Sequence, residues 1–203
     1  VSSPGFIPDP AERPLVALVL TGLGADAADY LVDMPVPLTL AVRPFLPYSL
    51  MVAESSVHHW HEVLVDMGGG ASKVEDPTSA LAALPFASGI RVEDALAGTI
   101  PSIPMGVLLH PSTMPLPEEG TPLTRLMAQD AARLGLDTAK ARALHLATTE
   151  GVGVLSVPHD HPQIDQVLKW SLDASDEGYR LVLVSEAIRE HQFRGPETDL
   201  DDE

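Results

Sequence analysis

Cysteine is absent from this 203-residue chain, so disulfide bonds, thiolate metal ligands and a cysteine nucleophile are excluded. Cations are also scarce, because 12 Lys and Arg residues stand against 29 Asp and Glu residues and give a formal net charge of -17. A surface of that charge repels phosphate backbones and anionic lipid headgroups. We therefore expect no nucleic-acid partner and no binding to an anionic membrane surface.

Long apolar runs are missing as well. No stretch approaches the roughly 20 apolar residues of a membrane span, so we expect no membrane insertion of this chain. The sequence begins with Val1 rather than Met and shows no leader segment, so we interpret it as a processed or excised piece from which a signal or anchor could have been removed.

Apolar residues nevertheless make up 45% of the chain, which is enough for one sizeable hydrophobic core. Four prolines among residues 1–14 predict an extended linker. Residues 195–203 are acidic and poor in apolar side chains, which predicts a solvated tail. We therefore predict a single domain over residues 15–194, between the linker and the tail.

Short apolar runs alternate with helical patterns through this domain. The first run, LVALVL at 15–20, is apolar at every position, which is typical of a strand buried on both faces of a parallel sheet. Repeated βα units predict an α/β fold with a parallel sheet, open or closed into a barrel. The predicted strands are 15–20, 38–42, 62–66, 106–109, 152–157 and 181–184, and the predicted helices are 25–33, 47–58, 90–97, 163–177 and 123–134, the last with Gly135 as its C-cap.

Ionisable side chains directly follow several of these strands. In parallel α/β folds the reactive groups gather beyond the carboxyl ends of the strands. The residues at such positions are Asp66, His110, His159 and His161. Carboxylate and imidazole are the ligands that a catalytic zinc takes when no thiolate is present, so a metal site is one interpretation.

Structural explanations compete with that interpretation. The Pro-His-Asp-His-Pro segment at 158–162 is compatible with a solvated turn, and His110 with a loop histidine bonded to the backbone. Asp66 could equally cap the segment after the glycine-rich stretch 68–77. The histidine cluster at 58–61 follows a helix rather than a strand, so we expect it on the surface.

A nucleotide-binding fold ranks low. Gly22 and Gly24 follow the first strand as in the dinucleotide pattern G-x-G-x-x-G, but the third glycine is replaced by Ala27. The sequence contains no G-x-S-x-G, P-loop or HExxH motif either.

Several stretches resemble the divergent polysaccharide deacetylase family. They are LVALVLTGLG at 15–24, MPVPLTLAVRPFLPY at 34–48, HEVL at 61–64, and, near the end, PHDHP at 158–162 with the last strand. The resemblance implies a distorted (β/α) barrel with a mainly parallel sheet. It also implies metal-dependent hydrolysis of a carbohydrate amide, and a periplasmic or secreted place in the bacterial cell envelope.

The residues that should carry the chemistry depart from the family pattern. Where the family has paired acids after its first strand, as metal ligand and catalytic base, this chain has Thr21 and Gly22. Neither side chain can accept a proton at neutral pH. Of the family's second ligand motif at best His110 is left, whereas His159 and His161 match the final motif.

We therefore expect a catalytically impaired domain, a pseudoenzyme without a cofactor. Its expected role is to bind an envelope glycan or a peptidoglycan-associated protein in polysaccharide and peptidoglycan maintenance. Thr21, Gly22, Gly68 and Gly69 are the predicted glycan-contacting residues. Loss of a catalytic base alone slows such a reaction by about 10²- to 10⁴-fold.

Two alternatives stay open. One is an active zinc-dependent polysaccharide deacetylase, with His159, His161 and Asp66 as catalytic candidates and the same three residues plus His110 as metal ligands. The other is a protein-binding regulator of peptidoglycan hydrolases.

Overall fold

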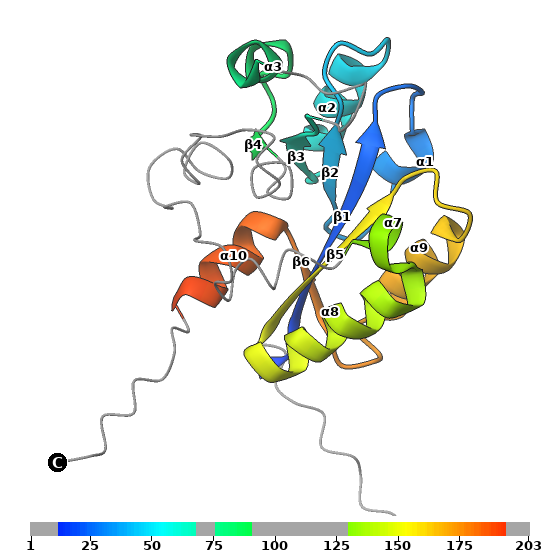
Figure 1. Cartoon of the computed structure of the whole chain (residues 1–203), viewed down its shortest axis with the longest axis vertical. Helices are drawn as coiled ribbons and strands as arrows, with labels where there is room; N and C mark the ends of the chain where they lie inside the picture. The colour runs from blue at the N-terminus through cyan, green and yellow to red at the C-terminus, as the bar shows by residue number, and fades with distance from the viewer. Residues whose placement is uncertain (1–11, 68–75, 91–129, 194–203) are drawn as a thin grey trace, which may run out of the picture.

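The computed structural model describes residues 12–67, 76–90 and 130–193 of the chain (Figure 1). Its strands are β1 (Leu15–Leu23), β2 (Thr39–Val42), β3 (Glu62–Val65), β4 (Gly89–Ile90), β5 (Val152–Pro158) and β6 (Arg180–Val182). Its helices are α1 (Asp29–Val32), α2 (Ser49–His58), α3 (Pro77–Ala83), α7 (Ala131–Leu134), α8 (Leu136–Glu150), α9 (Ile164–Asp173) and α10 (Val184–Phe193). The paired strands are all parallel, so the predicted α/β class with a mainly parallel sheet is confirmed.

Strand β1 is the centre of the sheet, whose order is β4-β3-β2-β1-β5 with β6 also paired to β1. β5 runs along one edge of β1 from Leu15 to Thr21. The other edge is shared, because β6 pairs with Leu15 to Ala17 and β2 pairs with β1 from Val19 onward. Where the two strands meet, the Val184 N–H donates to Thr39 Oγ1 at 3.0 Å.

Burial of β1 explains its uninterrupted apolar run. Each of its residues except Gly22 is buried, and α8 and α10 lie on either side of β1 and β5 (Figure 1). α8 approaches β5 through a face of small side chains, Ala139, Ala143 and Ala147. The strand therefore needs apolar side chains on both of its faces.

The predicted helix at 123–134 is confirmed from Ala131 to Leu134 and contradicted at Asp130. Asp130 is extended, with φ -99° and ψ 120°, and forms a bridge with Ser156 of β5. Its carboxylate accepts the Ala132 N–H at 2.8 Å and so caps α7, which begins only at Ala131. Gly135 does end α7, with φ 76°, as predicted. Residues 123–129 lie outside the described residues.

Other elements also differ from the prediction. The helices α3, α8 and α10 were not predicted, and α1 is shorter than the predicted helix at 25–33. Ile90, expected to begin a helix, belongs to β4. The rest of that predicted helix, the strand at 106–109, residues 1–11 and the acidic tail all lie outside the described residues.

A buried carboxylate ties the amino ends of three elements together. Glu62, at the start of β3, accepts hydrogen bonds from the Thr39 hydroxyl and the Ser185 N–H, both at 3.1 Å. Its other oxygen accepts from the Ser88 hydroxyl at 3.2 Å. The start of α10 is thus fixed by side chains of β2 and β3, since the free N–H groups of a helix start require acceptors.

The histidine cluster at 58–61 is only partly on the surface. His58 and His59 are exposed as expected, but His61 is only 5% exposed. Its Nδ1 accepts the Leu38 N–H at 3.3 Å, and its Nε2 donates to the Val32 carbonyl at 2.9 Å. The surface prediction is therefore wrong for His61, which joins the end of α1 to the start of β2.

Helix α2 ends in a turn whose left-handed position is taken by a tryptophan. The Trp60 N–H donates to the Val57 carbonyl at 3.1 Å and the His61 N–H to the Ser56 carbonyl at 3.0 Å, with φ 66° at Trp60. Glycine is the usual residue there, because a Cβ makes this conformation cost about 1–2 kcal/mol. Trp60 is 87% exposed, so packing of its side chain offsets little of that cost.

Replacing Trp60 by glycine is expected to raise the free energy of unfolding by about 1 kcal/mol, because it removes the backbone strain. Urea denaturation followed by circular dichroism measures this change. Trp60→Ala is the matched control, because it removes the indole but keeps the Cβ and the strain. A Trp60→Gly variant no more stable than Trp60→Ala would show that the turn carries no strain.

No helix in residues 12–67, 76–90 and 130–193 has the length and apolar character needed to cross a membrane.

Candidate functional site

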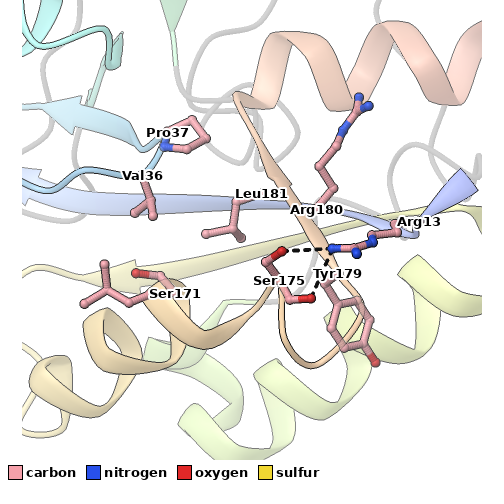
Figure 2. Close-up of a pocket in the computed structure, with 9 residues that line it drawn as sticks. Arg13, Val36, Pro37, Ser171, Ser175, Tyr179, Arg180 and Leu181 are labelled. Carbon is pink, nitrogen blue, oxygen red and sulfur yellow. Dashed lines mark hydrogen bonds between the residues drawn. The ribbon is translucent and has the colours of Figure 1, made fainter. Parts of the chain in front are cut away.

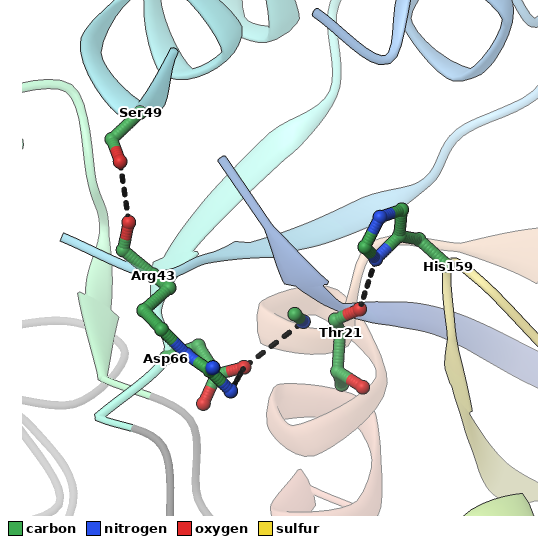
Figure 3. Close-up of polar contacts among 6 residues, drawn as sticks. Thr21, Arg43, Ser49, Asp66 and His159 are labelled. Carbon is green, nitrogen blue, oxygen red and sulfur yellow. Dashed lines mark hydrogen bonds and ion pairs between the residues drawn. The ribbon is translucent and has the colours of Figure 1, made fainter. Parts of the chain in front are cut away.

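The carboxyl ends of β1, β2, β3 and β5 bring a group of polar residues together (Figure 3). Thr21 and Gly22 come from the end of β1, Arg43 follows β2, Asp66 follows β3 and His159 follows β5. Four of these five residues were singled out from the sequence. Arg43 was missed, although it also directly follows a strand.

Asp66 is the carboxylate at the centre of this group. It is 2% exposed, and its Oδ2 accepts the Gly22 N–H at 2.9 Å. The Arg43 Nη2 lies 3.9 Å from the same oxygen. A buried carboxylate needs such partners, because burial without hydrogen bonds or an opposite charge is costly. Asp66 therefore links the ends of β1, β2 and β3 and does not cap α3, which is capped by Asp76.

An irregularity in β1 presents the Gly22 N–H to Asp66. The pairing of β1 with β2 shifts register between Leu20 and Leu23, and Gly22 has φ 80°. Glycine adopts that conformation without steric cost. A Cβ at position 22 would lie 3.5 Å from His159 Nδ1, so Gly22 directly borders the histidine.

His159 is oriented by the backbone of β1. Its N–H and its Nδ1 both bond the Thr21 carbonyl, at 2.9 and 3.1 Å, so Nδ1 carries a proton. Its Nε2 lies 4.0 Å from Asp26 Oδ2, and the side chain is 12% exposed. Nε2 is thus the nitrogen through which His159 could exchange a proton or contact a ligand.

His161 does not share this environment. Its Nδ1 accepts the Gln163 N–H at 3.1 Å, directly before α9. The His161 N–H in turn donates to the Pro158 carbonyl at 3.0 Å. For His161 the structure therefore supports the turn interpretation that the sequence left open.

The residues at this edge do not fit the zinc ion that the family resemblance implies. Among the residues that the structure describes, no three His, Cys, Asp or Glu side chains lie close enough together to hold a metal ion. Asp66 faces a guanidinium group, and the Nδ1 of His161 accepts an N–H, which places the ring proton on its Nε2. Of these three side chains, only His159 keeps a nitrogen, Nε2, that could bind a metal ion. The other candidates, His110, Gly68 and Gly69, lie outside the described residues.

Exposed aromatic side chains follow the same strands. Tyr30, on α1, is 50% exposed, and Phe45 and Tyr48, between β2 and α2, are 63% and 43% exposed. Phe45 has φ 64°, a left-handed conformation that is rare for a bulky residue and that tends to occur at functional sites. None of the three was predicted from the sequence, because neither the predicted helix at 25–33, which contains Tyr30, nor the pattern PFLPY at 44–48 indicates which rings are exposed.

Tyr30 also contacts the histidine segment. Its hydroxyl donates to the His159 carbonyl at 3.3 Å. Partial burial raises the pKa of the Tyr30 phenol, and three nearby aspartates raise it further. The phenol thus stays protonated at neutral pH and keeps its capacity to donate.

The arrangement suits binding of a neutral polar ligand better than acid–base chemistry. Amide, guanidinium, imidazole and phenol groups offer hydrogen bonds, and the exposed rings offer flat apolar faces. Asp66 is already held by Gly22 and Arg43. The carboxylate of Asp26, whose side chain is 64% exposed, lies 4.0 Å from His159 Nε2.

Comparison with known proteins supports the fold and leaves the family open. No family model matches the sequence, and no curated protein is significantly similar to it. The structure is similar to the crystal structure of the uncharacterized protein ATU2773 from Agrobacterium tumefaciens C58, with a TM-score of 0.57 and 17% sequence identity. The match covers 88% of this chain and 90% of that chain. At this identity the likeness concerns the fold alone.

Proposed function

We propose that this chain is a catalytically impaired, divergent polysaccharide deacetylase-like domain that binds an envelope glycan at the carboxyl edge of its sheet. The proposal includes a distorted (β/α) barrel and a periplasmic or secreted location, both of which rest on the sequence resemblance. The observation that carries it is the set of exposed aromatic residues, Tyr30, Phe45 and Tyr48, beside the hydrogen-bonding group around Asp66.

Glycan binding follows from the chemistry of these side chains. Sugar rings present a polar rim of hydroxyl and amide groups and apolar faces of C–H groups, so they suit a site with both aromatic faces and hydrogen-bonding groups. Phe45 supplies the most exposed ring and Arg43 the most accessible charged donor of the group. A neutral glycan also avoids the repulsion that this acidic chain exerts on anions.

Impaired catalysis follows from the end of β1. Hydrolysis of an amide by a metal-bound water needs a base for that water and an acid for the leaving amine. Thr21 and Gly22 supply no base, and Asp66 is engaged by an N–H group and a guanidinium. His159 keeps one nitrogen for proton exchange, and the Asp26 carboxylate 4.0 Å from it is largely exposed to solvent.

Replacing Phe45 by alanine is expected to weaken glycan binding about threefold to tenfold, because an aromatic contact contributes about 0.5–1.5 kcal/mol. The probe is tetra-N-acetylchitotetraose, titrated calorimetrically into the whole chain. The matched control is Phe86→Ala, because Phe86 is also partly exposed, at 39%, but lies between α3 and β4 at the other end of the strands.

Equal affinities of the two variants, or no saturable binding by the unaltered protein, would contradict the proposal. Release of free amine from the same oligosaccharide, lost in a His159→Ala variant, would instead establish an active deacetylase.

A further inference from the structure

A second candidate site lies at the opposite, amino-terminal end of the sheet (Figure 2). It is a cavity of about 420 Å³, within the size range of small-ligand sites. Its walls come from the segments that precede β1 and β2, from the end of α9, and from β6 and the turn before it. The lining residues are Arg13, Val36, Pro37, Ser171, Leu172, Ser175, Tyr179, Arg180 and Leu181. None of these residues belongs to the proposed glycan site.

The cavity has an apolar part and a polar part. Val36, Pro37 and Leu181 lie together on one side in Figure 2, and Arg13 and Ser175 lie on the other. A ligand that fills both parts must therefore combine an aliphatic group with a polar or charged one.

Arg13 determines the charge of the polar part. Its Nη1 donates to the carbonyl oxygen and the hydroxyl of Ser175, at 3.1 and 2.8 Å, which fixes the guanidinium in place. Among the described residues, Arg13 has no carboxylate within ion-pair distance, and its Nε is buried without an acceptor. Arg180, which lines the same cavity, is by contrast paired with Glu186 at 2.9 Å.

Arg13 differs from Arg180 in lining the cavity without a carboxylate partner, although the chain has 29 acidic and 12 basic residues. Arginine is well suited to binding carboxylates, because several of its N–H groups can bond the two oxygens. Within the cavity, Arg13 offers one guanidinium without a carboxylate, and with the net charge of -17 this favours a ligand with one negative charge over phosphates with more.

We propose that this cavity binds an aliphatic carboxylate, with the carboxylate on Arg13 and the aliphatic group against Val36, Pro37 and Leu181. The same chemistry is offered by a free branched-chain carboxylic acid and by the C-terminal residue of a peptide. The site is independent of glycan binding at the other end of the sheet.

The test uses isovalerate for the free acid and N-acetyl-L-leucine for the peptide end. Each is titrated into the whole chain, followed by amide NMR shifts, beside its uncharged counterpart, isovaleramide or N-acetyl-L-leucinamide. We expect saturable binding of at least one acid and at least tenfold weaker binding of its amide, because a hydrogen bond to a charged group contributes about 1.5–3 kcal/mol. The acid that binds more tightly identifies the source.

Arg13→Gln is expected to abolish the preference for the acid, and Arg142→Gln, the same change at an exposed position of α8, is expected to leave it unaltered. The proposal is overturned if neither acid binds saturably, if amides bind as tightly as acids, or if Arg142→Gln has the same effect as Arg13→Gln. The comparison of acid with amide on the unaltered protein holds even if Arg13→Gln does not fold.

Discussion

Gly153→Ala is expected to lower the free energy of unfolding by about 3 kcal/mol or more, the upper range for overpacking of a core. A Cβ at position 153 would lie 2.0 Å from the Ala143 carbonyl oxygen and 2.9 Å from its carbon. Both are backbone atoms of α8, so no side chain can turn away to make room. Urea denaturation followed by circular dichroism measures the loss, which requires α8 to move off β5.

The control for this substitution is Gly178→Ala. Gly178 has φ 90° and no atom within 4 Å of the added Cβ, so only the backbone strain of about 1–2 kcal/mol remains. If Gly153→Ala cost no more than Gly178→Ala, the close approach of α8 to β5 would be refuted.

His61→Ala is expected to lower the free energy of unfolding by about 2–4 kcal/mol, because it leaves the buried Leu38 N–H and Val32 carbonyl without partners. His58→Ala, at an exposed position of the same helix end, is expected to change stability by less than about 0.5 kcal/mol. Comparable losses in the two variants would contradict the bridging role of His61.

The same histidine makes stability depend on pH. Burial lowers the pKa of His61 below its usual 6.5, although the hydrogen bond to the Val32 carbonyl opposes this shift. The unfolded chain then takes up a proton near pH 6.5 that the folded chain does not bind, so the stabilising contribution is present above that pH and is lost as the pH falls further. The decline in unfolding free energy from pH 8 to 5 should therefore be smaller in His61→Ala than in the unaltered protein.

The sequence predicted the strands better than the helices, and the reason lies in the side chains that face inward. β1 and β5 are buried on both faces and show it as apolar runs. α8 instead packs through alanines, because Gly153 lets its backbone approach β5 closely, and an alanine face has weak hydrophobic periodicity. Thr39 and Glu62 bond the first N–H groups of α10. Both residues are far from α10 in the sequence, so a local sequence pattern cannot predict where this helix begins.

The closeness of the residues that follow neighbouring strands could be predicted from the sequence. Asp66 and His159 follow strands, and parallel pairing brings the ends of those strands together. The role of His161 could not be predicted, because the choice between metal ligand and turn depends on the direction of its Nδ1. Likewise, exposure of the Phe45 ring depends on a left-handed backbone that the sequence does not reveal.

The pairing of β1 with strands from the far end of the chain also has a consequence for biosynthesis. The first strand of the domain receives its neighbours β5 and β6 only from the far end of the chain, where Leu15 pairs with both Val152 and Arg180. Contacts between such distant segments form slowly, and an unpaired apolar strand edge invites association with other chains. A ribosome that has made β1 to β4 has thus produced a sheet in which β1 is paired with β2 but still lacks β5 and β6. Folding of this domain can be completed only after translation has passed β6.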